Sequence, residues 1–276
     1  MIRADLHIHT TASDGTDDPA SIGLLSSQSG LKWAAVTDHD TVDGIPGFIE
    51  GCCQEGIETL CGAEVSTGPK GRTHVLCYFK YKDLDRYEKY FSGIRDKRIE
   101  RAWEMVAALR RMGMDLDTDK IFSSSSSVGR PLIAREMVDK GYVATVAEAF
   151  QKYIGDGGPA YAPLPALSTS AAVKKIRDMG GVPVLAHPVQ MKLSGQELYQ
   201  TVKELKQNGL LGLEVYHPDQ QSDYSPYRSL AESEGLLKTG GSDYHGKNKD
   251  IALGCTSGAW PDAQKNIDRI LELLNR

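Results

Sequence analysis

The sequence has few cysteines, and their spacing does not favour disulfides or a thiolate metal site. Its five cysteines are an odd number, and no two of them form a Cys-x-x-Cys pair. Such cysteines are more typical of small buried hydrophobic residues in a reducing compartment than of a disulfide framework or a thiolate metal site. The sequence also shows no signal-peptide pattern and no apolar run long enough to cross a bilayer. We therefore expect a cytoplasmic protein without a membrane partner.

Positive charge is in the minority. The 32 Lys and Arg residues are outnumbered by 37 Asp and Glu residues, which gives a net charge of −5. This balance argues against bulk binding of DNA or RNA, although it allows a local basic pocket. A hydrophobic content of 40% is ordinary for a globular protein with a full core. At 276 residues, the chain has room for one large α/β domain or two average ones.

Strand and helix patterns alternate in residues 1–83 and again in residues 162–276. We predict seven strands, at 3–9, 31–37, 57–63, 73–78, 182–186, 210–216 and 236–240, with a hairpin turn at 68–71. Helices are predicted at 19–30, 46–56, 168–180, 195–208, 222–235 and 261–275. This order predicts an α/β fold with a largely parallel closed sheet, a distorted (β/α)7 barrel. An open doubly wound sheet is the alternative.

Residues 84–161 differ from the rest because they show helical periodicity and almost no strand pattern. The helices expected there span 85–112, with a possible break near Gly93, then 131–141 and 146–153, and a serine-rich loop lies at 123–127. We interpret this segment, called the helical insertion below, as a small domain over the mouth of the barrel.

The histidines follow the strands. Six of the seven lie at or just past the carboxyl end of a predicted strand, and His74 lies near the start of one. The full set is His7, His9, His39, His74, His187, His217 and His245. Four acids, Asp14, Asp38, Glu64 and Asp243, lie near the same strand ends. Because parallel barrels build their active sites at this face, we expect these side chains to converge.

The number of donors indicates several ions. One catalytic zinc needs three protein ligands, and imidazole with carboxylate suits Zn, Mn or Fe. The candidate ligands are His7, His9, Asp14, His39, Glu64, His74, His187, Asp243 and His245. These are too many for one ion, so we predict two or three divalent metal ions, with Glu64 as the bridge between neighbouring ions.

Such a centre favours hydrolysis of phosphate esters by metal-bound hydroxide, since bound metal lowers the pKa of water from about 15.7 to near 7. A phosphate substrate also needs cations outside the metal centre. Arg130 precedes Pro131 at a predicted helix start, where a bound anion would be favourable. Arg98 and Arg101 belong to a stripe on the long helix that could line a pocket, although a solvated helix face is the alternative. We interpret His217 as a hydrogen-bond donor to the substrate phosphate, and Asp38 as an acid that orients His39 or supports the ligands.

These motifs resemble those of the PHP (polymerase and histidinol phosphatase) family of metal-dependent phosphoesterases. The matching segments are Asp5-Leu6-His7-Ile8-His9, Thr37-Asp38-His39-Asp40, Gly62-Ala63-Glu64, Ala186-His187-Pro188 and Gly241-Ser242-Asp243-Tyr244-His245, with His74 and Asp14. The resemblance implies a distorted seven-stranded barrel with a trinuclear site. It implies that His7, His9, Glu64 and Asp243 hold one ion, that Glu64, His74 and His187 hold a second, and that Asp14, His39 and His245 hold a third.

The insertion, with Val128-Gly129-Arg130-Pro131 and Tyr161, resembles a small branch of the family that acts on nucleotides. The resemblance implies a small phosphorylated substrate, either a nucleoside 3′,5′-bisphosphate or the 5′ end of short RNA. Leu132 stands where relatives often carry His, and Gly158 where they often carry Lys. The competing interpretations are a histidinol-phosphate phosphatase and a non-catalytic metal-binding PHP module. An eight-stranded amidohydrolase is less favoured, because no predicted strand end offers a lysine to bridge metals.

Overall fold

The computed structural model describes residues 2–68, 73–123, 127–164, 167–220 and 223–275. Its single sheet has seven strands in chain order: β1 (Ala4–Ile8), β2 (Trp33–Val36), β3 (Glu58–Thr67), β4 (Thr73–Phe79), β5 (Val182–Leu185), β6 (Gly212–Tyr216) and β7 (Leu237–Gly240). The first and last strands approach each other through a bridge between Ile8 and Tyr244, so the barrel is nearly closed. The predicted (β/α)7 barrel is therefore confirmed, and the open doubly wound sheet was the wrong alternative.

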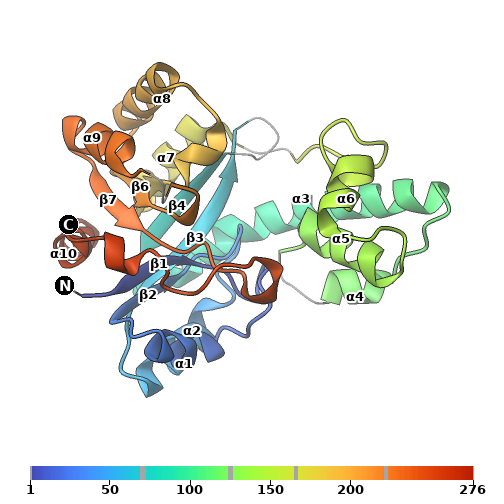
Figure 1. Cartoon of the computed structure of the whole chain (residues 1–276), viewed down its shortest axis with the longest axis horizontal. Helices are drawn as coiled ribbons and strands as arrows, with labels where there is room; N and C mark the ends of the chain where they lie inside the picture. The colour runs from blue at the N-terminus through green and yellow to red at the C-terminus, as the bar shows by residue number, and fades with distance from the viewer. Residues whose placement is uncertain (1, 69–72, 124–126, 165–166, 221–222, 276) are drawn as a thin grey trace.

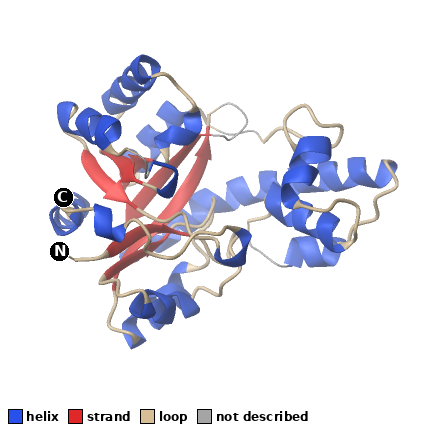
Figure 2. Ribbon diagram, viewed as in Figure 1, coloured by secondary structure: helices blue, strands red, loops and turns tan. Residues whose placement is uncertain are grey.

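The helices surround the strands outside the barrel (Figures 1 and 2). Those of the barrel are α1 (Ser21–Gln28), α2 (Ile45–Gln54), α7 (Thr169–Asp178), α8 (Gly195–Gln207), α9 (Ser225–Ser233) and α10 (Ala263–Leu274). Their ends follow from local chemistry. Ser168 caps α7 by accepting from Ala171 N, and Ser194 with Glu197 forms a capping box at the start of α8.

Strand β4 runs antiparallel to both of its neighbours. Its first residues therefore lie at the barrel end where the parallel strands finish, and His74 pairs there with Ser66 of β3. This explains how a histidine at a strand start joins histidines at strand ends. The same pairing extends β3 to Thr67, so Glu64 lies inside that strand. The sequence had predicted Glu64 at the strand's end. The predicted hairpin turn falls mostly outside the described residues.

The helical insertion contains α3 (Leu84–Arg111), α4 (Thr118–Ser123), α5 (Arg130–Asp139), α6 (Val146–Ala149) and the π-helical turn η3 (Phe150–Ile154). Its described part holds no strand (Figure 2). The predicted break near Gly93 was wrong, because α3 is continuous through it. Most of the serine-rich loop lies outside the described residues.

The insertion has its own hydrophobic core, separate from that of the barrel. Helix α3 contributes side chains to both hydrophobic cores. Its first half places Tyr87 and Phe91 in the barrel core, and its second half places Met105 and Leu109 in the core of the insertion. Figure 1 shows α3 running from the barrel into the insertion. One helix therefore fixes the insertion at the barrel rim, and the proposed boundary at residue 84 falls at the start of a shared helix.

Candidate metal centre

The barrel rim brings all nine predicted ligands together. Seven of them are buried, with at most 7% of their surface exposed, while His39 and His74 are partly exposed. They come from strands and from the loops that follow them: His7 (β1), His9 and Asp14 (after β1), His39 (after β2), Glu64 (β3), His74 (β4), His187 (after β5), Asp243 and His245 (after β7).

Glu64 lies at the middle of this group. Its Oε2 is 3.1 Å from His9 Nε2 and 3.4 Å from His7 Nε2. Its Oε1 is 2.9 Å from His74 Nδ1 and 2.8 Å from His187 Nε2. Oε2 also lies 3.1 Å from His39 Nδ1, so it faces His7, His9 and His39, while Oε1 faces His74 and His187. A carboxylate whose two oxygens face different imidazoles is suited to bridge two ions.

The donor atoms fall into overlapping groups. Those of His7, His9, Glu64 and Asp243 lie within 4.8 Å of one another, as do those of His9, Asp14, His39 and His245. His74 Nδ1 and His187 Nε2 are 3.3 Å apart and share Glu64 Oε1. The structure therefore gathers each of the three sets implied by the resemblance, with His9 close to two of them. Which ions these sets hold stays a prediction.

The hydrogen bonds of three histidines fix which ring nitrogen is free. His245 Nδ1 lies 2.8 Å from the carbonyl oxygen of Asp243, which can only accept, so Nδ1 carries the proton and Nε2 faces Asp14. His7 Nδ1 likewise faces Glu214 Oε1 at 3.0 Å and leaves Nε2 toward the centre. His217 has the opposite tautomer, because its Nδ1 accepts from Asp219 N and its Nε2 therefore carries the proton.

The electrostatics also fit divalent ions. Burial raises the pKa of Glu64, but His74, His39 and His7 together bring it well below its ordinary value. Burial lowers the pKa of His9, whereas hydrogen bonds with Asp243 and Glu64 raise it to about 9. The Nδ1 of His9 is buried without a hydrogen-bond partner among the described residues, and that of His39 lies 3.1 Å from Glu64 Oε2. The pKa values of His7, His9 and His74 are raised by the nearby carboxylates, so without ions protons on these three rings supply positive charge to the centre.

Two supporting acids hold the ligands. Glu214, fully buried in β6, accepts from His187 N at 2.7 Å as well as facing His7. The sequence reading missed it, although a charged residue inside the apolar run Leu213-Glu214-Val215 is itself a signal. Asp38 does not orient His39. Its carboxylate accepts from Thr10 N, Thr10 Oγ1 and Ser13 Oγ, so it supports the loop that carries Asp14.

Backbone strain gathers at the same rim. Among described residues other than glycine, positive φ angles occur at Asp40 (51°), His187 (25°), Lys192 (54°) and Asp243 (54°). Two of these are candidate ligands, and Asp40 lies next to a third. Such conformations cost about 1–3 kcal/mol each and persist where the surroundings enforce them, which is typical of functional sites.

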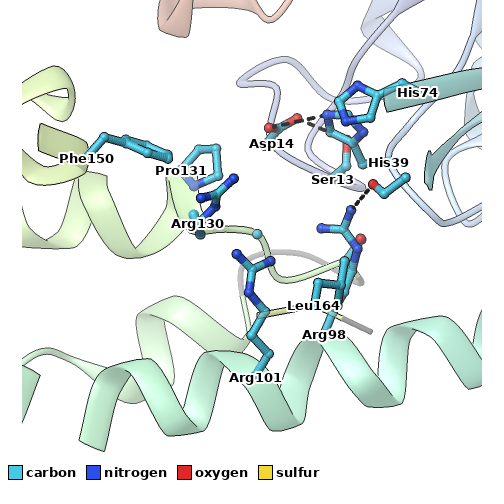
Figure 3. A pocket seen from close by; sticks show the side chains of 13 residues that line it. Ser13, Asp14, His39, His74, Arg98, Arg101, Arg130, Pro131, Phe150 and Leu164 are labelled. Atoms are coloured by element: carbon cyan, nitrogen blue, oxygen red, sulfur yellow. Dashed lines mark hydrogen bonds and ion pairs between the residues drawn. The ribbon is translucent and has the colours of Figure 1, made fainter. Parts of the chain in front are cut away.

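A pocket opens between the centre and the helical insertion (Figure 3). Asp14, His39 and His74 lie on its barrel side, while Arg101 and Arg130 face it from α3 and from the start of α5. Arg101 is 8% exposed, and its Nε donates to Ala162 O. Its Nη2 is buried and has no hydrogen-bond partner in the described part of the chain. Burial, with the nearby charges of Arg130 and Arg98, lowers the pKa of Arg101 to about 10. An anion in the pocket would relieve this unbalanced charge.

The other predicted substrate residues are placed differently. Arg98 lines the pocket, but it donates to Asp40 and to Ser66 Oγ. His217 is fully buried, and its Nε2 faces Asp243 Oδ2 at 3.5 Å instead of the pocket. Leu132 packs against the core of the insertion.

Gly158, the other departure from the family pattern, has no room for a side chain. An added Cβ would lie 2.3 Å from the carbonyl oxygen of Tyr153. A lysine cannot occupy this position without a shift of the backbone.

Comparison with known proteins decides the family. Residues 5–158, more than half of the chain, match the PHP domain. The chain belongs to this family. A 5′-3′ exoribonuclease from Haemophilus influenzae is 28% identical over 258 residues, which cover 90% of this chain and 94% of the relative. A 3′,5′-nucleoside bisphosphate phosphatase from Chromobacterium violaceum is 28% identical over 250 residues, which cover 89% of this chain and 88% of that relative.

Among solved structures, a protein assigned as a metal-dependent phosphoesterase from Bifidobacterium adolescentis superposes with a TM-score of 0.84 at 28% identity, covering 98% of this PHP chain and 96% of that one. The comparisons confirm the predicted family and reaction class: the protein is a metal-dependent phosphoesterase. No described helix is both long and apolar enough to span a membrane.

Proposed function

We propose that this PHP protein hydrolyses a phosphate ester of a small nucleotide that carries a second phosphate, or of the 5′ end of short RNA. The observation that carries this proposal is Arg101, whose buried Nη2 has no hydrogen-bond partner among the described residues and which lines a pocket shared with the candidate metal ligands. One phosphate would lie at the ligands and another anionic group at the arginines. The cavity of about 190 Å³ is smaller than the about 300–1,000 Å³ of pockets that enclose whole ligands, so it suits the phosphorylated end of a substrate.

The residues of the centre have two roles, as ligands of the ions and as partners that fix the protons of the ligand histidines. We assign His7, His9, Glu64 and Asp243 to one ion, Glu64, His74 and His187 to a second, and Asp14, His39 and His245 to a third, with Mn, Fe or Zn as candidates. Bound ions of this kind supply a Lewis acid that polarises the phosphoryl group and lowers the pKa of water. Glu214 and the carbonyl of Asp243 keep the proton of His7 and of His245 on Nδ1, so that each Nε2 stays available.

The arginines bind and orient the substrate. Arg130 begins α5, and its Nη1 lies 3.4 Å from Asp156 Oδ1, so an anionic substrate group would share this guanidinium with Asp156. The guanidinium of Arg130 lies 5.3 Å from the ring centroid of Phe150 and 5.8 Å from that of Tyr161. Arg101 adds a planar donor from α3. We assign Arg98 the separate role of holding Asp40 next to His39, since its donors are used there.

Two alternatives fit less well. Histidinol phosphate carries an amine and an imidazole beyond its phosphate, and these basic groups would approach Arg101 and Arg130. The carboxylate of Asp156 is already paired with Arg130 at 3.4 Å. A non-catalytic PHP module is disfavoured because every candidate ligand position is filled and the donors converge.

The test compares substrates and variants together. With added Mn²⁺, a nucleoside 3′,5′-bisphosphate and a 5′-phosphorylated dinucleotide should be hydrolysed with higher kcat/KM than a nucleoside 3′-monophosphate or histidinol phosphate. Arg101→Met should raise KM for the bisphosphate about tenfold or more and leave KM for the monophosphate nearly unchanged. Arg110→Met is the matched control, because Arg110 is exposed on the same helix and pairs with Asp115. Equal KM values for Arg101→Met and wild type on the bisphosphate would contradict the proposal.

A further inference from the structure

Lys249 is a cation at the candidate metal centre that no sequence pattern marks. It follows the short helix η6 (Gly246–Asn248) in the loop after β7. Its Nζ lies 2.5 Å from Oδ2 of Asp243, and its side chain is 35% exposed, whereas that of Asp243 is 5% exposed. A buried candidate ligand therefore already has a full positive charge from the protein beside it.

The two oxygens of Asp243 face different neighbours. Oδ1 lies 3.3 Å from His9 Nε2 and 3.6 Å from His7 Nε2, within the group that we assign to the first ion. Oδ2 faces Lys249 and the protonated Nε2 of His217. Oδ1 is therefore the oxygen that would help to hold an ion among these ligands, since Oδ2 already contacts Lys249.

The loop that carries Lys249 is fixed to the opposite side of the centre. Asn248 Nδ2 donates to Asp14 O at 2.6 Å, and Lys247 N donates to Thr16 Oγ1 at 2.9 Å. Gly246 has a φ of 63°, and an added Cβ would lie 2.0 Å from Thr16 Oγ1, so the loop packs against residues 14–16 without space for a side chain there. The position of the ammonium group is thus set by the fold.

We propose that Lys249 is a built-in counter-charge to Asp243 that stabilises the metal-free centre and weakens the binding of the first ion. This inference rests on the proposed function, in that Asp243 is taken as a ligand. An ammonium group and a divalent ion on the two oxygens of one carboxylate repel each other, and the site is too buried for water to screen them fully. The same ammonium group offsets the negative charge of Asp243 when no ion is bound.

Two other roles for Lys249 predict different results. A purely structural lysine would, when replaced, weaken the fold and the metal site together. A lysine that binds substrate phosphate would change KM without changing metal affinity. Only the proposed counter-charge predicts opposite effects on two measurements. Neutralising Lys249 should raise the affinity for Mn²⁺ and lower the unfolding temperature of the metal-free protein.

The experiment measures Mn²⁺ affinity by competition with a chelating indicator at one pH, and the thermal unfolding of the metal-free protein. Lys249→Met should bind Mn²⁺ about tenfold more tightly than wild type and unfold about 2–4 °C lower without metal. Lys249→Arg, which keeps the charge, should resemble wild type. Lys247→Met is the matched control, because Lys247 lies in the same loop and contributes a backbone hydrogen bond.

Lys249→Gln provides a second neutral variant that can still donate to Asp243, and it should also bind Mn²⁺ more tightly. Unchanged or weaker Mn²⁺ binding by both neutral variants, while wild type binds normally, would overturn the role of Lys249 and leave the proposed function standing. Absence of Mn²⁺ binding by wild type would overturn both.

Discussion

Replacing Glu214 by Gln should damage the metal centre while preserving its shape. Glu214 Oε2 accepts from the backbone N–H of His187, which can only donate. In Glu214→Gln, the remaining carbonyl oxygen must take that position, and the amide NH₂ then faces His7 Nδ1. An amide NH₂ cannot accept from His7, so the ring must accept at Nδ1 and carry its proton on Nε2. That nitrogen points toward Glu64 and Asp243, where a ligand needs a free lone pair.

The expected magnitudes separate binding from folding. Loss of an outer partner of a metal-bound histidine typically costs 10–100-fold in affinity. Because the substitution also inverts the tautomer of His7, we expect the upper end, about 100-fold or about 2.8 kcal/mol. The free energy of unfolding should fall by a similar or smaller amount, about 1.5–3 kcal/mol, since hydrogen bonds to a charged carboxylate are replaced by hydrogen bonds to a neutral amide. Glu214→Ala would leave two buried donors without an acceptor and should cost about 3–5 kcal/mol.

The assay is Mn²⁺ titration against a chelating indicator, with chemical denaturation in parallel. Glu204→Gln is the control, because Glu204 is exposed on α8. NMR of ¹⁵N-labelled histidine would report the proton position on the His7 ring directly. Wild-type Mn²⁺ affinity in Glu214→Gln, or a His7 ring that keeps its proton on Nδ1, would refute the tautomer argument.

Two further predictions concern the pH dependence and the packing. The folded pKa of His9 is about 9, above its ordinary 6.5, so its stabilisation of the metal-free protein is complete below pH 6.5 and is lost as the pH rises to about 9. Thermal unfolding in the presence of a chelator should show this fall, Mn²⁺ affinity should rise over the same range, and a flat profile for both would contradict the shift. Gly51→Ala should lower the free energy of unfolding by about 1–3 kcal/mol, because its Cβ would lie 1.9 Å from Ala20 O. Chemical denaturation should find Gly258→Ala nearly neutral, since no atom lies within 4 Å of its Cβ, and an equal effect at both glycines would contradict the packing argument.

The sequence predicted those parts of the centre that depend on strand position alone. His7 and His9, two residues apart at the end of β1, both reach the centre, although the strand has ended at Ile8. His39, His187 and His245 follow strands that end at the same rim of the barrel. The alternation of strands and helices fixes that rim, because parallel strands all finish at one side.

The remaining parts depend on pairing and charge, which sequence position does not encode. The antiparallel β4 became evident only from its register with β3 and β5, and it is what brings His74 to the rim. Whether Arg98 or Arg101 pairs with a carboxylate depends on which of them meets Asp40, on a different element. Arg98 does so, while Arg101 Nη2 has no hydrogen-bond partner among the described residues. Lys249 reaches Asp243 because its loop is bound to residues 14–16, which lie more than two hundred positions earlier in the chain.

The charges of the centre also bear on the order of folding and metal entry. Carboxylates buried without cations would oppose folding, and small zinc domains avoid this by folding only with their metal. Here, His7 and His9 have raised pKa values despite their burial, so protonated imidazoles can balance Glu64 before any ion arrives. The ammonium group of Lys249 balances the charge of Asp243 in the same way. Metal entry then exchanges protons for ions in a centre that is already assembled, so metal content can respond to pH and to metal supply without the fold being lost.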